Sequence, residues 1–293
     1  MIKRIFVTIL FISSFLVLGA TQVSADRVLD EFKKIEFKQF GDTDEDPYWW
    51  IINNGDQGQH YEGCSDAACV LAEKGPGGNT DEKEKFYARL QLLPDQTPGF
   101  YTGAEISEAQ TGYAYGQPAK WYPSVGHPVT ATTRVRFSGN YHQDGGGGAV
   151  GSAGFWLWNS PADFINLEFH PATALGFIWV EDEALIGDGL RMIVLQDDDY
   201  SHNEPVTIPL DLTQWTDWKI IWSVDENEQQ TLQFFIDDTL VGQTTLTTPL
   251  PALSITLWND NQYPALLNGE YTIEYHPASA TQNFDIAYVE VSR

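Results

Sequence analysis

Short runs rich in β-branched and aromatic residues recur along the second half of this sequence, separated by clusters of Gly, Pro, Asn and Asp. Clear examples span 128–139, 153–159, 164–170, 189–196, 217–225, 231–245, 252–260 and 284–293. Helical periodicity is nearly absent, and the best helix candidate, "DRVLDEFKKIEF" from residue 26, could equally be an extended segment. Runs of this length at this spacing are typical of antiparallel sandwiches. The pattern therefore predicts an all-β fold of two antiparallel sheets.

Turn residues place two hairpins within residues 217–245. The first is expected to turn at Asp225-Glu226-Asn227-Glu228 and the second at Asp237-Asp238. The Gly-rich stretch 142–154 is interpreted as a loop inside the domain, because strands of the same style resume on both sides of it. No internal repeat and no later boundary is visible, so residues 26–293 are predicted to form a single domain.

The first 25 residues have the features of a secretory signal peptide. Lys3 and Arg4 precede an apolar run from Ile5 to about Leu18, and small residues around Ala25 suggest a cleavage site. The apolar run is short for a spanning helix, which needs about 20 residues. An uncleaved anchor is the alternative, since the two kinds of segment look alike. We expect a secreted, periplasmic or extracellular protein.

The chain is strongly acidic. Its formal charge is −25, and removal of residues 1–25 would change it to −27, because that segment holds two cations and no acid. Such a surface argues against nucleic acid and against a membrane of anionic lipid as partners. It leaves a neutral partner open, and acidity that serves solubility alone explains the charge equally well.

The two cysteines, Cys64 and Cys69, lie close together in "GCSDAACVL". Export to an oxidising compartment favours a disulfide between them. The closed loop is short, so the chain-entropy model assigns it only about 2 kcal/mol. Two cysteines with a single histidine nearby, His60, make a poor zinc site, which needs four ligands.

Several segments together resemble glycoside hydrolase family 16 and its relatives in the concanavalin A-like lectin/glucanase superfamily. The segments are "FYTGAEISEAQ" (100–110), "TATTRVRFSG" (130–139), "GFWLWN" followed by "FINLEF" (154–169), "QWTDWKIIWSVDENEQQTLQFFIDDTLVGQ" (214–243) and "FDIAYVEVSR" (284–293). The fold that this resemblance implies is a concanavalin A-like jelly roll, with a sugar cleft on its concave face. The implied partner is a polysaccharide or oligosaccharide.

The catalytic strand of that family reads Glu-x-Asp-x-Glu, or Glu-x-Asp-x-x-Glu with a bulge. Without a bulge, Glu168 matches the acid/base and Asn166 the middle Asp, while Phe164 takes the place of the nucleophile. With a bulge, Asp163 matches the nucleophile, but Ile165 replaces the middle Asp. A retaining mechanism needs two carboxylates about 5–5.5 Å apart. Neither register is intact, so the resemblance leaves open whether the protein is an enzyme.

Tryptophans are the first candidates for sugar binding. Trp156 and Trp158 alternate with Phe155 and Leu157 on one predicted strand, so one pair enters the core and the other faces away. The pattern does not decide which pair faces the cleft. Trp258 lies at a strand end where the resemblance places cleft residues.

Three further residues complete the predicted binding set. Trp121 and Tyr122 lie in a loop between two prolines, and loop aromatics are good ligand candidates. His170 follows Glu168 by two positions, so on a continuous strand it would share the face of that glutamate and could line the cleft. A histidine that points into a loop is an equally good interpretation.

The remaining acidic clusters are interpreted as solvated turns and loops at 41–47, 180–189 and 196–204. The alternative for 180–189 is a catalytic acid. The oxygen-rich composition of 196–204, and of 41–47 without the full calcium-loop spacing, leaves a structural calcium ion open, and no other cofactor is expected. The histidines lack the spacing of a catalytic metal site, and no Gly-x-Ser-x-Gly or phosphate loop is present.

Three functions remain in competition. The first is a secreted protein that binds a β-glucan-type polysaccharide with degenerate catalysis. The second is an active retaining glycoside hydrolase that uses Glu168 with Asp163 or another acid. The third is a surface-interaction module without sugar chemistry. A polysaccharide lyase is a minor fourth possibility, because no Tyr/His/Lys group capable of proton abstraction is evident.

Overall fold

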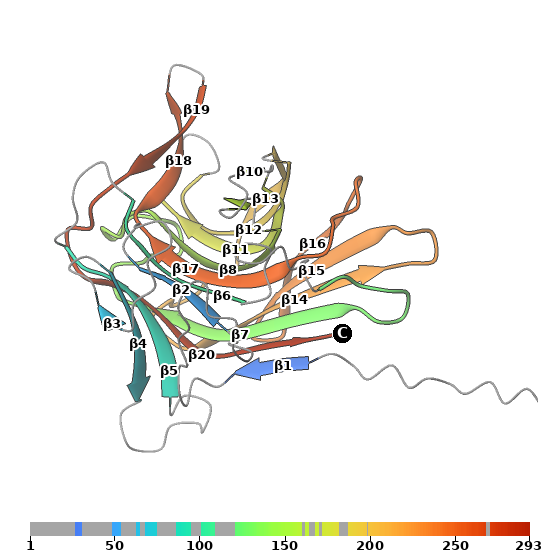
Figure 1. Ribbon diagram of the computed structural model, residues 1–293, viewed down its shortest axis with the longest axis horizontal. Coiled ribbons are helices and arrows are strands. Elements are labelled where there is room, and N and C mark those ends of the chain that lie inside the picture. The colour runs from blue at the N-terminus through green and yellow to red at the C-terminus, as the bar shows by residue number, and fades with distance from the viewer. Residues whose placement is uncertain are drawn as a thin grey trace, which may run out of the picture.

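A computed structural model of the chain contains two large antiparallel sheets packed face to face (Figure 1). It describes residues 27–30, 49–53, 63–64, 68–74, 86–94, 101–108, 121–159, 162–163, 168–169, 172–181, 187–197, 199–267 and 270–293. Every regular element within these ranges is a strand, as the sequence predicts. None of the described residues forms a helix with the length and apolarity needed to cross a bilayer. The predicted signal peptide lies outside the described residues.

The larger sheet has nine strands. Along its main path they are β16 (Thr239–Thr245), β15 (Gln230–Ile236), β14 (Thr216–Val224), β7 (Val129–Phe137), β20 (Gln282–Ser292), β5 (Phe86–Leu92), β4 (Ala68–Lys74) and β3 (Gly63–Cys64). The ninth strand, β1 (Arg27–Asp30), pairs with the C-terminal half of β20. The segment from residue 26 therefore begins as an extended strand and not as a helix.

The smaller sheet has seven strands. They are β13 (Asp199–Pro205), β12 (Gly189–Gln196), β11 (Ala174–Val180), β8 (Ser152–Trp158), β17 (Ser254–Asp260), β6 (Gly103–Glu108) and β2 (Trp49–Asn53). Two short pairs stand apart from it, β9 (Ala162–Asp163) with β10 (Glu168–Phe169), and β18 (Gln262–Leu267) with β19 (Glu270–Tyr275). In Figure 1 the seven-stranded sheet curves away from the nine-stranded sheet, so its outer face is concave.

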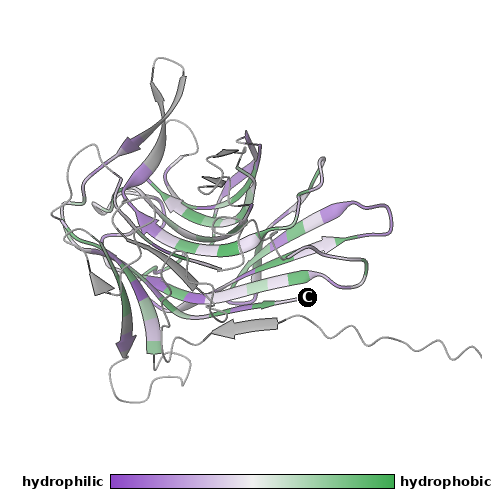
Figure 2. Cartoon of the chain, in the orientation of Figure 1, coloured by the Kyte–Doolittle hydropathy of each residue, from purple (hydrophilic) through white to green (hydrophobic). Residues whose placement is uncertain are grey.

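Strict alternation of side chains builds the core between the sheets. On β14, Trp218, Ile220 and Trp222 are buried while the intervening residues are partly exposed. Phe155 on β8 and Phe177 on β11 supply the facing side of the same cluster. Figure 2 shows the alternation as bands of green and purple along the strands. Because side chains on a strand point to opposite faces in turn, the positions between these core residues must lie on the outer faces.

Both predicted hairpin turns are confirmed. Asp237 and Asp238 connect β15 to β16 with φ values of 46° and 61°. Positive φ at both central residues is the two-residue hairpin turn whose twist matches that of the strands, and Asp tolerates it better than most residues. At the other turn, the Asp225 carboxylate accepts hydrogen bonds from the backbone N–H groups of Asn227 and Gln229, both at 2.9 Å or less.

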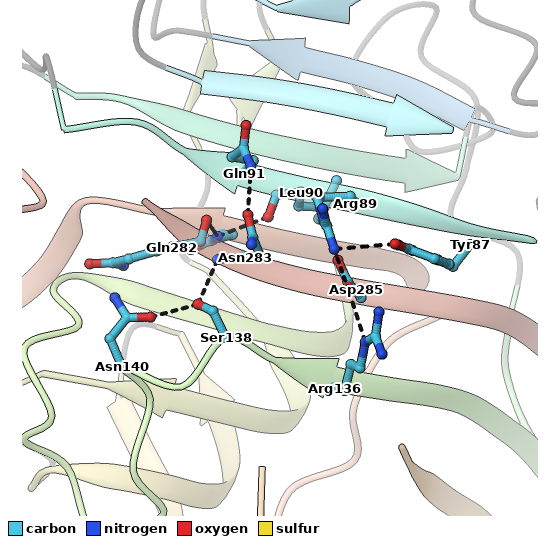
Figure 3. A network of polar contacts seen from close by, with 11 residues as sticks. Tyr87, Arg89, Leu90, Gln91, Arg136, Ser138, Asn140, Gln282, Asn283 and Asp285 are labelled. Atoms are coloured by element: carbon cyan, nitrogen blue, oxygen red, sulfur yellow. Dashed lines mark hydrogen bonds and ion pairs between the residues drawn. The ribbon is translucent and has the colours of Figure 1, made fainter. Parts of the chain in front are cut away.

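A polar network crosses the outer face of the nine-stranded sheet (Figure 3). Asp285 on β20 is buried and accepts hydrogen bonds from Arg89 on β5, at 2.7 Å, and from Arg136 on β7, at 2.9 Å. The Arg136 guanidinium also lies 4.5 Å above the ring of Trp215. One carboxylate thus joins three adjacent strands, and two cations satisfy its charge.

The predicted cysteine pair is brought together in register. Cys64 on β3 lies directly opposite Cys69 on β4, and the described part of the chain contains no free cysteine. The register supports a disulfide, which stays a prediction.

Loss of Asp285 should destabilise the protein far more than loss of a surface partner. Asp285→Ala leaves two arginines without their shared counter-ion, and breaking a buried pair costs about 3 kcal/mol or more. Because both arginines are partly exposed, we expect about 2–3 kcal/mol in urea denaturation. Asp238→Asn is the control, since it removes the charge of an exposed pair with Lys219, while Asn tolerates the positive φ of the turn, so it should matter little. Equal effects of the two substitutions would contradict this account.

Mass spectrometry of the unreduced, exported protein should show Cys64 and Cys69 joined. No Lys or Arg lies between them, so both fall on one tryptic peptide, which should take up alkylating reagent only after reduction. The reason is that a lone pair in register will oxidise outside the cell. Two alkylatable thiols in the unreduced sample would reject the disulfide.

Candidate functional site

Three tryptophans form a row on the concave face of the seven-stranded sheet. Trp156 lies between the other two, with ring centroids 4.2 Å from Trp258 and 5.3 Å from Trp158. Trp156 and Trp158 are partly exposed, whereas Trp258 is 5% exposed. Their strand neighbours Phe155 and Leu157 occupy the main core, so alternation leaves the tryptophans on the outer face. Phe155 and Leu157 are thus the pair that enters the core, which the sequence pattern did not decide.

Glycines make room for this row. In the strand register, Trp258 lies opposite Gly154 and Trp156 lies opposite Gly176. A Cβ atom at Gly154 would come 2.7 Å from Cη2 of Trp258, and one at Gly176 would come 2.5 Å from Cβ of Trp156. The missing side chains therefore let large indoles lie against the sheet. Glycine inside a strand commonly marks such a close approach.

A short line of polar groups lies beside the row. Glu105 on β6 is opposite Trp258, and Ser107 is opposite Thr256. Ser107 Oγ donates a hydrogen bond to Glu105 Oε1, and the Ser107 and Thr256 hydroxyls are 2.7 Å apart. Burial raises the pKa of Glu105 to about 7, while the hydrogen bond from Ser107 opposes this shift. A buried carboxyl at such a pKa can either donate or accept a hydrogen bond near neutral pH.

A second buried carboxyl lies on the same face. Asp260, at the end of β17, accepts a hydrogen bond from Ser152 Oγ at 2.8 Å, and the Trp258 indole N–H donates to the same Ser152 oxygen at 2.8 Å. Burial is the main reason that the pKa of Asp260 rises to about 8, and the nearby Glu105 adds to the shift. Two carboxyls with raised pKa values on one concave face are unusual enough to mark a candidate site.

The structure gathers some of the predicted binding residues and separates others. Trp156, Trp158 and Trp258 lie together in the row. Trp121 does not belong to a ligand surface, because it is 1% exposed within the main core and its backbone pairs with Leu253. This corrects the expectation from its loop position.

Tyr122 is 40% exposed and packs edge-on against Trp222 at 5.6 Å, while its hydroxyl accepts a hydrogen bond from Gln230. It remains accessible but lies next to a core residue of the nine-stranded sheet and not in the row. His170 lies outside the described residues.

The segment expected as one catalytic strand is divided. Asp163 on β9 lies directly opposite Glu168 on β10 in an antiparallel pair. The two residues are therefore on neighbouring strands, and not on the single bulged strand that the sequence predicted. Asn166 and Phe164 lie outside the described residues. Pairing across two strands therefore brings the two candidate carboxylate residues into register, in place of the single bulged strand that the sequence suggested.

No metal centre emerges from the acidic clusters. Among the described residues, no group of three or more His, Cys, Asp and Glu side chains is placed to hold a metal ion. The stretch 196–204, interpreted from its composition as an exposed acidic loop, instead forms the hairpin of β12 and the edge strand β13, with Asp197 at the turn. The acidic stretch 41–47 lies outside the described residues.

A separate cavity of about 600 Å³ lies away from the concave face, between the loops around residues 139–144 and 205–213. Its described lining holds three aspartates, Asp144, Asp188 and Asp211, and no tryptophan. We rank it below the concave face, because it offers no aromatic platform comparable with the row.

Glu105, Ser152 and Asp260 were not among the residues predicted to form the site. A signal for Glu105 was present, since "GAEISE" alternates small or apolar residues with Glu105 and Ser107. Asp260 and Ser152 come close to it only through pairing between β8, β17 and β6, which sequence spacing does not show.

Folding stability should fall as the pH rises from about 5 to about 8. In the unfolded chain the carboxyls of Glu105 and Asp260 ionise near pH 4, whereas in the folded protein burial raises their pKa values to about 7 and 8. The stabilisation is complete below the unfolded values and is lost progressively until the pH has passed the folded ones, by at most about 1.4 kcal/mol per pH unit for each group. Above the folded values the profile should level off.

Calorimetric melting temperatures across this range test the expectation. The isosteric double variant Glu105→Gln/Asp260→Asn should flatten the profile, because it removes both titrating groups. A wild-type profile that is already flat or rising would contradict it.

Comparison with known proteins supports the architecture. No protein-family model matches the sequence, and no curated protein sequence matches it. The structure is similar to a β-glucanase from Bacillus licheniformis, with a TM-score of 0.51, 11% identity, and coverage of 92% of this chain and 99% of that one. It is also similar to a GlcNAcα1-4Gal-releasing endo-β-galactosidase from Clostridium perfringens, with a TM-score of 0.51, 13% identity, and coverage of 92% of this chain and 62% of that one. The concanavalin A-like jelly roll predicted from the sequence is thus the observed fold.

Proposed function

We propose that this protein binds a β-glucan-type polysaccharide on the concave face of the seven-stranded sheet and hydrolyses it weakly or not at all. The observation that carries this proposal is the tryptophan row beside Glu105, Ser107 and Thr256. Large indoles on the outer face of a sheet, next to buried polar groups, combine an apolar platform with a few directional hydrogen bonds. That combination is typical of small-molecule and sugar sites.

The exposed end of the row is the expected stacking surface. Trp156 has another indole on each side, and Trp258 is almost fully buried. Trp158 is partly exposed, so we expect its exposed ring atoms to contact the C–H face of a pyranose. Glu105 is the most exposed of the neighbouring polar groups, at 9%, and we expect its carboxyl to meet a sugar hydroxyl as donor or acceptor. The more deeply buried Ser107 hydroxyl holds this carboxyl in place.

The charge of the chain favours a neutral glycan. At a formal charge of −25, long-range repulsion disfavours sulfated or carboxylated polysaccharides, whereas it does not oppose a neutral β-glucan. The names of the two similar structures, a β-glucanase and an endo-β-galactosidase, support a glycan as the ligand class by analogy of fold.

An active retaining hydrolase is the second candidate, and one observation favours it. Asp163 and Glu168 are directly opposite in the register of β9 and β10. Retaining glycosidases hold their two carboxyl groups at about 5–5.5 Å. Against this candidate, the family's motif is intact in neither register. Without a bulge Phe164 takes the nucleophile position, and with a bulge Ile165 replaces the middle Asp.

A glycan array followed by calorimetric titration tests the binding. Wild type should bind a neutral β-glucan, and Trp158→Ala should weaken binding about tenfold, which corresponds to the loss of one aromatic stacking contact. Trp215→Ala is the matched control, because Trp215 lies on the outer face of the other sheet and should leave affinity unchanged. An array with no glycan signal would favour the surface-interaction module and end this proposal.

A reducing-end assay on the same glucans separates the two candidates. We expect little or no product. Brisk hydrolysis that is lost in both Glu168→Gln and Asp163→Asn would establish the hydrolase. Brisk hydrolysis that survives both substitutions would exclude this carboxylate pair.

A further inference from the structure

Ser152, Asp260 and Trp258 form a hydrogen-bond chain beneath the tryptophan row. The Trp258 indole N–H donates to Ser152 Oγ at 2.8 Å, and the Ser152 hydroxyl donates to Asp260 Oδ1 at 2.8 Å. All three residues are buried, with exposures between 5% and 7%. The serine hydroxyl therefore uses its single proton toward Asp260 and a lone pair toward Trp258, which fixes the direction of the chain.

Apolar contacts surround the indole of Trp258. Gly154 gives it room against the sheet, the ring centroid of Trp156 is 4.2 Å away, and Ile178, Val180 and Ile193 belong to the same cluster. None of these contacts gives the indole N–H a hydrogen-bond acceptor. The hydrogen bond to Ser152 is the directional contact, and it comes from the residue at the beginning of β8.

We propose that Asp260 and Ser152 are positioning residues of the glycan site, which hold the Trp258 indole in place and thereby set the position of the tryptophan row. This inference rests on the proposed glycan binding. Trp258 supports one face of Trp156, and Trp156 supports Trp158, where the sugar is expected to stack. A rotation of Trp258 would therefore reach the exposed end of the row.

Asp260 is suited to this role in both of its protonation states. Its Oδ1 atom accepts two hydrogen bonds, from Ser152 Oγ and from the backbone N–H of Gln262 at 3.2 Å. A proton bound by the carboxyl therefore resides on Oδ2, and Oδ1 remains an acceptor. The titratable groups around it are Glu105 on β6 and Tyr141.

The same carboxyl also connects the row to the hairpin of β18 and β19. Gln262, the first residue of β18, donates to Asp260, and Asn261 between them accepts a backbone hydrogen bond from His276 just beyond β19. One buried side chain thus ties together the start of β8, the end of β17 and the base of this hairpin, which projects from the sandwich in Figure 1.

Indole N–H resonances of the ¹⁵N-labelled protein report the chain directly. The Trp258 signal is identified as the one missing from Trp258→Phe. Ser152→Ala should shift that signal, because the N–H loses its acceptor, and should raise the Kd for the glycan about tenfold. Ser223→Ala is the matched control, since this serine donates only to a backbone carbonyl on the other sheet and should change neither quantity.

Two substitutions at Asp260 keep the test decisive if Ser152→Ala folds poorly. Asp260→Asn retains an acceptor oxygen and should keep the Trp258 resonance and an affinity within about threefold of wild type. Asp260→Ala removes the acceptor and should move the resonance and weaken binding. An unmoved resonance in both Ser152→Ala and Asp260→Ala, or wild-type affinity in both, would overturn the positioning role.

The outcomes separate this inference from the proposed function. If wild type binds glycan and Trp158→Ala weakens binding while Ser152→Ala does not, glycan binding stands and the positioning role falls. If wild type binds no glycan, the proposed function fails, and the role of the chain in glycan binding fails with it.

Discussion

The packing of the two sheets decides which side chains remain available for function. Each strand of the seven-stranded sheet has only two faces, and the face toward the nine-stranded sheet is filled by residues such as Phe155, Leu157 and Phe177. The burial of this apolar surface is the main stabilising term for the fold. Because the side-chain period is two, a register slip of one residue would place the tryptophans in the core and the core residues outside. The concave site therefore follows from the same alternation that holds the sheets together.

The concave face carries features that a purely structural surface would avoid. Glu105 and Asp260 are buried carboxyls that pack among tryptophans, and burial makes their ionised forms costly. The residues around them limit this cost, because Ser107 and Ser152 supply hydrogen bonds. Residues that are unfavourable for folding, such as buried carboxyls, are found in native proteins chiefly at functional sites. Two such buried carboxyls on the concave face support this face as the candidate site, in preference to the cavity lined by Asp144, Asp188 and Asp211.

Much of the fold was predictable from the sequence because local signals agree with the tertiary pairing. The hairpin turn at Asp237-Asp238 and the alternation along 217–225 are local properties, and both appear in the structure. The strand β11 escaped notice because all seven of its residues are buried, so it has no polar alternation to reveal it. The edge strand β13 was mistaken for a loop because its exposed, acidic sequence has little strand propensity.

The site was harder to predict than the fold, since its members meet only across strands. The tryptophans were found by residue type, but their face depended on which neighbours entered the core. Trp121 was misassigned because a loop position normally suggests exposure, whereas a backbone bridge to Leu253 draws it into the core. Glu105 and Asp260 lie far apart in sequence and come close only because β6 pairs with β17.

The tryptophan row and the candidate carboxylate pair lie on different strands of this chain. The tryptophan row lies on β8 and β17, two adjacent strands in the middle of the seven-stranded sheet, and the core beneath them holds both strands in place. The candidate carboxylates Asp163 and Glu168 lie on β9 and β10, a two-stranded pair outside that sheet. The three tryptophans contact one another along β8 and β17, and Phe155 and Leu157 anchor β8 in the core on the opposite face. The core beneath the seven-stranded sheet therefore positions the row, whereas the carboxylate pair depends on the register between β9 and β10.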